Sequence, residues 1–600
     1  MDSQPLIIEG PEQSKVDPHL PDGGLPPAIG VQSWCVFRAS RSVPEMTDTK
    51  GWTYHHHVDM ACWKGRLYVG WNSCEKDEDV WPSRELYSTS VDGANWDAPR
   101  EMFPQGLSTC LRMYFYLAPN GRMLMIGGLR KDVDNTSEEK KGGVVVREIR
   151  ADHTLGEIYA LQFSAESPSP GTPGEGRGGG RTGETPTPTL PRGTRGGDKG
   201  EAQLARFDES SDSQFIAACR ALLADRIFLE QQDRGRLLGP RRMKWHDAAA
   251  WPGGKVPGDS DKWVSGKAFS FLRRPDEVIL AVSKMGFTTL SHDHGETWDQ
   301  PVVPATLITG KAKVWAQQTA DGRFALVYNP SKRHRFPLIV VTGEDAIHFK
   351  DMRIIQGELP IQRYEGRFRS IGPQYVRGIS HWSDDGSRAD RENVMWLVCS
   401  MNKEDIWVSR VPVPIKKDAT STEEPWNIYC PKWAKVVAHG NNVELEDRDP
   451  YDYARAVRMF PVSRAVTASF ELTADQTDSG MLEIELMGGF GSPHALRISL
   501  RPGGEIFCGE EQRIGAYVVG RKISVQIDAN ASAGTFSITL DGNRVVSNAE
   551  FAEAASELSR ISFRTGPYRS IGGAKPVPSG SDRPTPAARY TISGVVRIQS

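Results

Sequence analysis

The sequence lacks the features that mark membrane, nucleic-acid-binding and disulfide-rich proteins. No run of about eighteen apolar residues is present, so no membrane span is predicted. The 73 basic and 76 acidic residues nearly balance, and no block of lysines and arginines supports nucleic-acid binding. Eight cysteines are scattered without C-x-x-C spacing, which argues against a zinc cluster or a dense disulfide framework.

Several catalytic motifs are also missing. There is no G-x-S-x-G elbow, no P-loop and no H-E-x-x-H. Gly174, Gly176 and Gly179 spell G-x-G-x-x-G, but they lie in a segment with no strand before it and no helix after it. No cofactor and no metal are therefore expected.

The first residues, Met1 to Gly24, are acidic and rich in proline. They contain no basic region followed by an apolar stretch, so no signal peptide is predicted. The chain as given is expected to be cytoplasmic, and periplasmic or secreted if translation starts upstream.

Among the motifs that are present, the octet 291–298 is the most informative, and it reads S-H-D-H-G-E-T-W. Gly295 can adopt the positive φ of a tight turn, and the Asp293 carboxylate can accept hydrogen bonds from turn amides. Ser291 adds a hydroxyl acceptor, and Trp298 can pack beneath the hairpin. The octet predicts a hairpin between two outer strands, in which Asp293 builds the turn and is not a catalyst.

Two further octets, 89–96 and 342–349, repeat this pattern with the acid shifted by one position. The interval from the octet at 291 to the one at 342 is about 50 residues, which is the length of one four-stranded propeller blade. The repeat therefore predicts a β-propeller. The positions that match the first octet are Asp92, Gly93, Trp96, Asp345 and Phe349.

Residues 30–414 alternate short β-rich runs with turn dipeptides such as Asn120-Gly121 and Asp321-Gly322, after a polar lead-in at 1–29. Without an insertion in this region, its length gives seven blades of about 50 residues, with six as the alternative.

The insertion is the segment 167–203, which is rich in proline and glycine and almost free of large apolar residues. Such a composition predicts disorder. Asp212 then caps a predicted helix within 211–225 that decorates the propeller.

A second β-rich domain is predicted at 434–600, after a linker at 415–433. Runs such as Ala465–Leu472 and Thr535–Leu540 alternate with period two. The fold class is therefore all-β. This second domain resembles a concanavalin-like jelly-roll sandwich, a type of module that often binds carbohydrate and equally often is a structural partner.

Three consecutive histidines occur at 55–57 in a chain that contains only thirteen. Alternation along a strand would place His55 and His57 on one face and His56 on the other. A neutral imidazole can take or give a proton near pH 7. The alternatives are a solvated or hydrogen-bonded histidine cluster and a metal site with Asp59.

A second cluster, at 363–377, combines arginines with two tyrosines. A guanidinium grips a carboxylate in a bidentate way, and a tyrosine next to positive charge can act as an acid or a base. The alternative is an arginine-rich solvated loop. The candidates are Arg363, Arg367, Arg369 and Arg377 for substrate binding, and Tyr364 and Tyr375 for catalysis.

A third group consists of polar side chains that could bind sugar hydroxyls or carboxylates at the channel mouth of the propeller. Contacts that stabilise the blades explain these residues equally well. The members are Lys313, Gln317, Asn329 and Arg335.

The three octets resemble the Asp boxes, or BNR repeats, of the sialidase-like β-propeller superfamily over residues 30–414. Tyr-x-His-His at 54–57, followed by Lys-Gly-Arg-Leu-Tyr at 64–68, resembles a bacterial branch that attacks rhamnose–uronate linkages, such as ulvan lyases and a rhamnosidase. The resemblance implies that His56 and His57 are the paired catalytic histidines. It also implies roles for a tyrosine and arginines, for which Tyr364, Arg367, Tyr375 and Arg377 are the candidates.

The segment Phe37-Arg38-Ala39-Ser40 keeps only two residues of the sialidase motif Phe/Tyr-Arg-Ile-Pro, so a sialic-acid arginine triad is not expected. The leading hypothesis is a carbohydrate-active enzyme, either a glycoside hydrolase or a polysaccharide lyase. It would cleave a uronate-containing glycan by histidine-centred acid–base chemistry. The alternatives are a non-catalytic carbohydrate-binding propeller and, third, an exo-sialidase. A poly- or oligosaccharide partner and a monomeric state are expected.

Overall fold

The computed structural model contains two compact units. The first comprises Met1–Gly51, Val303–Val376 and Ala389–Ser600, and the second comprises Trp52–Val302 and Arg377–Arg388. The structure describes residues 5–10, 16–78, 80, 82–104, 113–130, 141–163, 204–232, 268–284, 286–299, 301–379, 393–489, 494–569 and 582–594. The insertion predicted at 167–203 lies outside the described residues.

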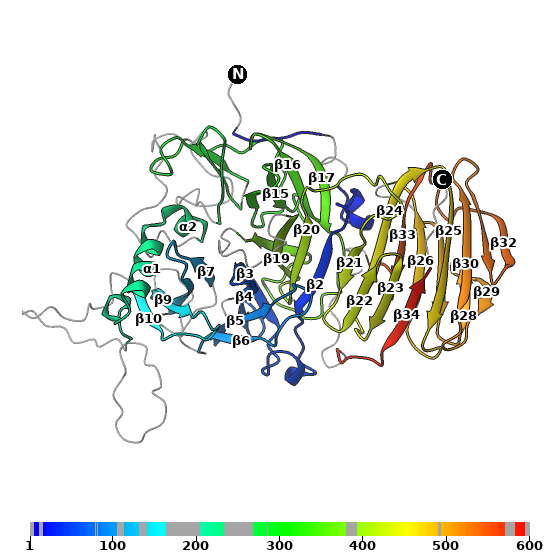
Figure 1. Ribbon diagram of the computed structural model, residues 1–600, viewed down its shortest axis with the longest axis horizontal. Coiled ribbons are helices and arrows are strands. Elements are labelled where there is room, and N and C mark those ends of the chain that lie inside the picture. The colour runs from blue at the N-terminus through cyan, green and yellow to red at the C-terminus, as the bar shows by residue number, and fades with distance from the viewer. Residues whose placement is uncertain are drawn as a thin grey trace, which may run out of the picture. The chain divides into compact units, whose positions relative to one another are not determined.

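The second unit contains three antiparallel sheets whose strands follow one another in chain order (Figure 1). Strands in the first two sheets are almost entirely buried, in keeping with their apolar and aromatic residues. The first sheet is β3 (Tyr54–Trp63), β4 (Arg66–Cys74), β5 (Ser83–Ser90) and β6 (Arg100–Phe103). The second is β7 (Tyr114–Leu117), β8 (Met123–Arg130), β9 (Lys141–Ile149) and β10 (Tyr159–Phe163), and the third is β11 (Ser270–Arg273), β12 (Ile279–Val282) and β13 (Thr288–Ser291).

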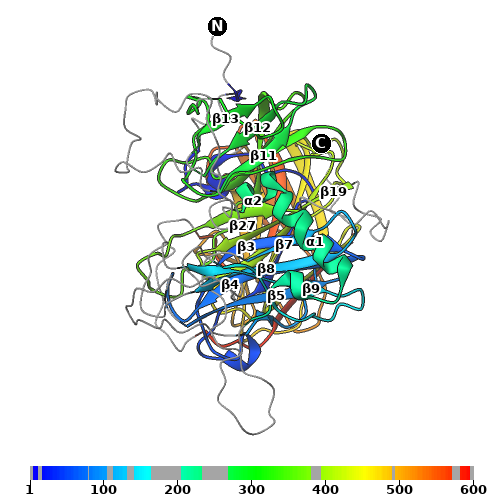
Figure 2. The same ribbon diagram turned by 90° about the vertical axis from the view of Figure 1, so that its left-hand side faces the viewer.

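Two helices of the second unit pack against its second sheet (Figure 2). They are α1 (Ser213–Ala224) and α2 (Arg226–Gln231). The Asp212 side chain accepts hydrogen bonds from the amides of Gln214 and Phe215, which confirms the predicted cap and helix. In the part of the chain that the structure describes, no helix has the length and apolar character needed to cross a membrane.

The first unit contains two further groups of strands of the same up-and-down kind. One is β14 (Trp315–Gln318), β15 (Phe324–Tyr328), β16 (Leu338–Gly343) and β17 (His348–Gln356), with β1 (Ile7–Ile8) parallel to β17. The other is β18 (Pro373–Gly378), β19 (Val394–Met401) and β20 (Asp405–Pro412), completed by β2 (Gln32–Phe37) from the start of the chain. The last two residues of β18, Arg377 and Gly378, belong to the second unit.

This antiparallel order is that of propeller blades, and the arrangement is propeller-like. Within the described residues, four separate sheets have this order, and the group β18-β19-β20-β2 is part of a larger sheet. The predicted count of six or seven blades is therefore not confirmed.

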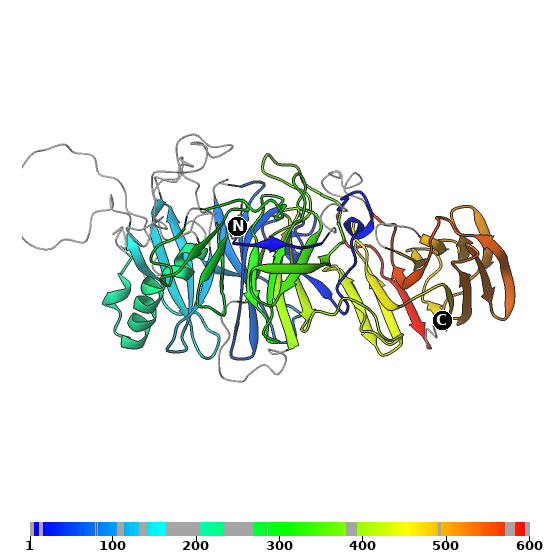
Figure 3. The same ribbon diagram turned by 90° about the horizontal axis from the view of Figure 1, so that it is seen from above.

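The larger sheet continues from β2 into a β-sandwich, seen in yellow to red in Figures 1 and 3. Apolar residues that alternate along the strands of its two layers form one buried core. In the layer that continues from β2, the order is β21 (Asn427–Cys430), β24 (Arg455–Ser463), β33 (Leu558–Arg564), β26 (Leu482–Met487), β27 (His494–Arg501), β28 (Glu505–Cys508) and β29 (Gln512–Ala516). In the other layer it is β22 (Ala434–His439), β23 (Asn442–Asp447), β34 (Ala588–Ser593), β25 (Ala465–Ala474), β30 (Ile523–Asn530), β31 (Thr535–Leu540) and β32 (Asn543–Glu550).

The octet at 291–298 forms the hairpin turn that its sequence predicts. The Asp293 carboxylate accepts hydrogen bonds from the Thr297 amide at 2.8 Å and from the Ser291 hydroxyl at 2.9 Å. Gly295 has a φ of 89°, and Trp298 is buried. Asp293 is therefore a turn residue.

The two echoes of this octet form related turns. Asp92 accepts hydrogen bonds from the Ala94 and Asn95 amides, and Gly93 has a φ of 82°. In the other turn, burial raises the pKa of the Asp345 carboxyl, but hydrogen bonds from His348 and Ile347 outweigh it and lower the pKa to about 2. Trp96 is half-buried and Phe349 is fully buried.

Candidate functional site

Tyr375, in the first unit, lies between two cationic side chains. The Lys313 Nζ atom is 5.4 Å from the centroid of the tyrosine ring, and the Arg335 Cζ atom is 5.3 Å from it. Tyr375 has a φ of 60°, a left-handed conformation that costs free energy for a bulky residue. The surrounding fold therefore holds this side chain in a specific place.

The elements around Tyr375 fix the two cations. Arg335 lies in the loop between β15 and β16, and its Nη1 donates to the Ser370 hydroxyl at 3.2 Å and to the side-chain amide oxygen of Gln374. Gln374 in turn donates to the Ser370 backbone carbonyl at 2.7 Å. Lys313 lies two residues before the start of β14 and is 8% exposed. Lys313, Arg335 and Tyr375 are thus brought together, and we call them the cationic cluster.

The remaining members of the third sequence group have different surroundings. The Asn329 amide donates to the carbonyls of Pro337 at 3.0 Å and Pro373 at 2.9 Å. Its buried Oδ1 accepts no hydrogen bond from the described residues. Gln317 accepts a hydrogen bond from the Trp315 indole at 2.7 Å, which fits the blade-stabilising alternative.

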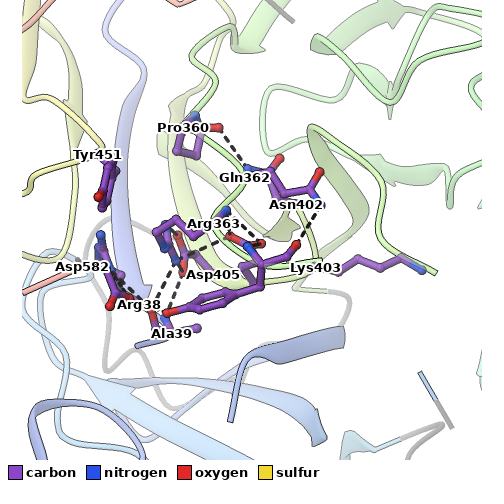
Figure 4. Close-up of polar contacts among 12 residues, drawn as sticks. Arg38, Ala39, Pro360, Gln362, Arg363, Asn402, Lys403, Asp405, Tyr451 and Asp582 are labelled. Atoms are coloured by element: carbon purple, nitrogen blue, oxygen red, sulfur yellow. Dashed lines mark hydrogen bonds and ion pairs between the residues drawn. The ribbon is translucent and has the colours of Figure 1, made fainter. Parts of the chain in front are cut away.

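Arg363 is buried among carboxylates of its own chain (Figure 4). Its guanidinium forms a two-point contact with Asp405 at 2.9 and 2.5 Å and lies 3.7 Å from Glu404. Burial lowers the pKa of Arg363, but these two carboxylates more than compensate and raise it. The bidentate face of Arg363 is therefore used within the fold.

Tyr364 is 4% exposed, and both hydrogen-bonding positions of its hydroxyl are occupied. The hydroxyl donates to the Asp582 carboxylate and accepts a hydrogen bond from the Arg41 amide at 3.2 Å. Burial raises the pKa of this tyrosine well above its usual value, and Asp582 raises it further. Tyr364 therefore stays protonated and serves as a structural donor.

The other arginines of the second sequence group diverge. Arg367 is exposed and stacks over Phe368, with 5.1 Å from Cζ to the ring centroid. Arg369 donates to the Lys403 carbonyl at 2.8 Å. Arg377 belongs to the second unit, where its buried side chain donates to the Gln231 carbonyl at 2.8 Å.

Arg38, which retains part of a sialidase motif, is also bound by the fold. Its Nε and Nη2 donate to Asp449 at 2.5 and 2.9 Å, and its Cζ lies 3.9 Å from the centroid of the Trp433 ring. Its bidentate fork therefore already holds a carboxylate of the chain.

The three consecutive histidines at 55–57, in the second unit, have separate environments at the start of β3. His55 has both ring nitrogens in hydrogen bonds, with the Trp52 carbonyl at 2.9 Å and the Trp71 indole at 3.1 Å. Since the indole only donates, His55 Nδ1 is the acceptor and Nε2 carries the proton. His55 is thus a structural residue.

His56 and His57 are neighbours, with 4.6 Å between the ring centroids. The His57 Nε2 atom lies 3.4 Å from the Glu78 carboxylate. The predicted strict alternation of the histidines is wrong beyond His56, because β3 has a bulge between His56 and Asp59 and His57 has a φ of 53°. Among the described residues, no group of His, Cys, Asp and Glu side chains is placed to hold a metal ion.

Several partners of these residues had no motif that could identify them. Gln374, Glu78, Asp405 and Asp582 are single polar residues whose neighbours lie far away in sequence or across a loop. Among the candidates, His57 and Tyr375 have a positive φ, which is a strained backbone conformation that the sequence did not reveal.

Two protein families match the chain, one in its first part and one in its last part. Residues 6–171 match the family described as BT_1020-like, N-terminal beta propeller. Residues 426–576 match the family described as Sialidase-like, CBM domain. No curated protein matches the chain in sequence. The finer resemblance to ulvan lyases and rhamnosidases stays a prediction.

A solved structure named "Sialidase" is similar to nearly the whole chain, with 28% identity, a TM-score of 0.82 and 99% of this chain covered. The match covers 54% of that protein, so the chain spans about half its length. Trypanosoma rangeli sialidase in complex with sialic acid also matches, at 12% identity and a TM-score of 0.33, with 95% of this chain and 96% of that protein covered. The chain therefore combines a sialidase-like, propeller-type region with a sandwich similar to a sialidase-like CBM domain.

Proposed function

We propose that the protein is a carbohydrate-active enzyme, a glycoside hydrolase or polysaccharide lyase, that grips its glycan by a sugar carboxylate. The observation that supports this proposal most strongly is the cationic cluster, in which Lys313 and Arg335 flank the strained Tyr375. Similarity over the chain to a protein named "Sialidase" supports a carbohydrate substrate.

The cluster has the chemistry that a uronate requires. Arg335 supplies a planar fork for a carboxylate, and Lys313 adds a second positive charge. Lys313 and Arg335 together match the negative charge of a uronate carboxylate.

Tyr375 is the better catalytic candidate of the two tyrosines. The Tyr364 hydroxyl is taken by Asp582 and the Arg41 amide, whereas Tyr375 lies beside two cations that can stabilise charge during proton transfer. In a lyase, this tyrosine would protonate the leaving oxygen.

His56 and His57 are separate acid–base candidates in the second unit. Glu78 can orient the His57 ring through the contact at 3.4 Å. In a lyase that acts at these histidines, a histidine would be the base that removes the proton. In a hydrolase, it would activate water or protonate the leaving group.

The test uses the full chain with a panel of uronate-containing oligosaccharides. New reducing ends together with new ultraviolet absorbance identify a lyase, since elimination leaves an unsaturated uronate. Reducing ends without that absorbance identify a hydrolase. If no product forms from any acidic or neutral glycan while binding is measurable, the alternative of a non-catalytic binding propeller replaces this proposal.

Variants then test each residue. Lys313→Met and Arg335→Met are expected to raise KM about tenfold or more for acidic substrates. Arg333→Met is the matched control, because this exposed arginine lies in the same loop. Tyr375→Phe and His57→Asn are expected to lower kcat about 100-fold or more. Asn suits the left-handed backbone at position 57, so this variant removes the imidazole without adding strain.

An exo-sialidase is the third candidate, after the non-catalytic binding propeller, and the name of the similar solved structure favours it. Release of sialic acid from a reporter sialoside tests it directly. Because Asp449 already occupies the Arg38 fork, we expect no such release.

A further inference from the structure

The second unit has a groove that is unrelated to the histidines. Its volume is about 800 Å³, within the usual range for ligand pockets. One wall is formed by the start of β4 and by the turn and strand that follow β5, and the other by the hairpin between β9 and β10. The polar residues that line it most prominently are Arg66, Asp97, Arg100, Glu101, Asp152 and His153.

The groove lies about one strand length from His56 and His57. These histidines are at the beginning of β3, a strand of ten residues that ends at Trp63, and Arg66 begins the next strand. Six residues separate His57 from Trp63, which at about 3.3 Å per residue is roughly 20 Å. A sugar bound in the groove therefore does not reach the histidines.

The walls of the groove are held in place by contacts within the fold. Arg66 donates to the Asp97 carboxylate at 3.0 Å and to the Thr89 hydroxyl at 2.9 Å. The Arg100 guanidinium covers the Tyr87 ring at 4.9 Å. These contacts keep the polar groups at fixed positions, which lowers the entropy cost of binding.

The opposite wall is equally fixed. Asp152 accepts hydrogen bonds from the Thr154 amide at 3.0 Å and from its hydroxyl at 2.6 Å. His153 has a φ of 65°, and its Nδ1 shares a hydrogen bond with the Tyr68 hydroxyl. Burial and the nearby charge of Arg66 lower the pKa of His153, so the ring is neutral near pH 7.

The charges of the groove determine which ligand it suits. The lining has two arginines and three carboxylates, and the charges of Arg150 and Lys64 act on Asp152 and His153 from nearby. The charges therefore nearly balance, so the groove favours neither an anionic nor a cationic ligand. The lining offers guanidinium donors next to carboxylate acceptors, and sugar hydroxyls both donate and accept. An uncharged chain with many hydroxyls matches this lining.

We propose that this groove is a non-catalytic binding site for uncharged sugar units of a polysaccharide. This proposal goes beyond the proposed cleavage of an acidic glycan, because the groove lies away from the cationic cluster's residues in the chain and suits an uncharged ligand. In this role it holds the protein on a polymer while a different site acts.

Native gel electrophoresis of the full chain tests the proposal, with gels that contain xylan, dextran, galactan or arabinan, and polygalacturonate as the acidic comparison. At least one neutral polysaccharide is expected to retard the protein. Arg66→Ala combined with Asp97→Ala, and separately Ala98→Trp, which fills the groove without removing a polar group, are expected to weaken that retardation about fivefold or more.

The matched control is Arg226→Ala combined with Glu296→Ala, an ion pair of the same unit with similar exposure. It is expected to leave the retardation unchanged. The proposal fails if no neutral polysaccharide retards the protein, or if both groove variants bind like the parent. It also fails if polygalacturonate binds more tightly than the neutral polymers and depends on the same residues. Kinetics on short acidic substrates, which should not change in the groove variants, keep this outcome separate from that of the proposed activity.

Discussion

The Tyr364 hydroxyl donates a hydrogen bond to the Asp582 carboxylate, although the two residues are 218 positions apart. Tyr364 lies in the loop between β17 and β18, and Asp582 lies just before β34 of the sandwich. The same carboxylate accepts a hydrogen bond from the Ser42 hydroxyl and lies 3.8 Å from Arg38. The sandwich therefore holds the loop that leads into the strand of Tyr375.

Removing either partner of this pair should destabilise the protein. Tyr364→Phe and Asp582→Asn are each expected to lower the free energy of unfolding by about 1–3 kcal/mol, because a charged hydrogen bond is lost in a buried place. Denaturant unfolding of the single and double variants measures the coupling. Tyr517→Phe, which removes a hydrogen bond to the neutral Arg501 carbonyl, is the control and should cost about 1 kcal/mol. Strictly additive losses would contradict a direct interaction.

A truncated chain without residues 426–600 should not fold. β2 pairs with β21 from Gln32 to Trp34, so the truncation leaves this edge of β2 unpaired. It also leaves the buried Arg38 without Asp449. Expression of residues 1–425 is expected to give aggregated protein, judged by sedimentation and circular dichroism. A soluble product with cooperative unfolding would show that the sandwich is dispensable.

Gly372→Ala should impair both stability and substrate binding. Gly372 has a φ of 107°, and a Cβ atom there would overlap the Arg335 carbonyl oxygen. We expect a loss of about 2 kcal/mol or more and a higher KM for acidic substrates, because Arg335 must move. Gly322→Ala is the control: its φ is 81°, but nothing lies within 4 Å of the added Cβ. It should cost about 1 kcal/mol and leave KM unchanged.

Asp293→Ala should weaken the turn and leave the chemistry intact. The carboxylate accepts hydrogen bonds from the Thr297 amide, the Thr297 hydroxyl and the Ser291 hydroxyl. Its loss is expected to cost about 1–3 kcal/mol. Below the melting temperature, kcat/KM should equal that of the parent, and a tenfold fall would assign Asp293 a role in turnover.

Asp447 should make stability depend on pH. Burial raises the pKa of its carboxyl to about 7, while a hydrogen bond from Thr565 acts in the opposite direction. The unfolded carboxyl titrates near pH 4, so the folded state binds the proton more tightly. This contribution to stability is present below about pH 4 and is lost as the pH rises to about 7.

Asp447→Asn should remove this dependence. Relative to the parent, the variant is expected to gain stability as the pH rises from about 4 to about 8, by an amount on the order of 2–4 kcal/mol. Melting temperatures across that range, compared with those of Asp475→Asn, measure the effect. Parallel curves for parent and Asp447→Asn would contradict it.

The predictions that the structure confirms concern side chains that form hydrogen bonds with residues a few positions away in the sequence. In the octet, Asp293 reaches Thr297 and Ser291 reaches Gly295, so the sequence contains both partners of each contact. Asp212 and the helix it caps are similar. For these features, local physics is sufficient.

The site was less predictable because its contacts join distant segments. Arg363 and Arg335 look alike in sequence, yet Asp405 engages Arg363 in the fold, whereas Arg335 lies against Tyr375. His55 and His57 are likewise equivalent in the sequence. In the structure, Trp71 forms a hydrogen bond with His55, and a bulge in β3 changes the backbone after His56. Residue spacing in the sequence does not predict hydrogen-bonding partners that lie in distant segments.

Periodicity and contacts within a few residues were enough to predict the all-β architecture with a β-sandwich, and the turns around Asp293, Asp92 and Asp345. The predicted domain bounds stay a prediction. Only the tertiary structure places Lys313 next to Tyr375 and Asp582 next to Tyr364. It also decides that Arg363 pairs with Asp405 and that Arg38 pairs with Asp449. The difference arises because burial and pairing of charges depend on where distant strands meet.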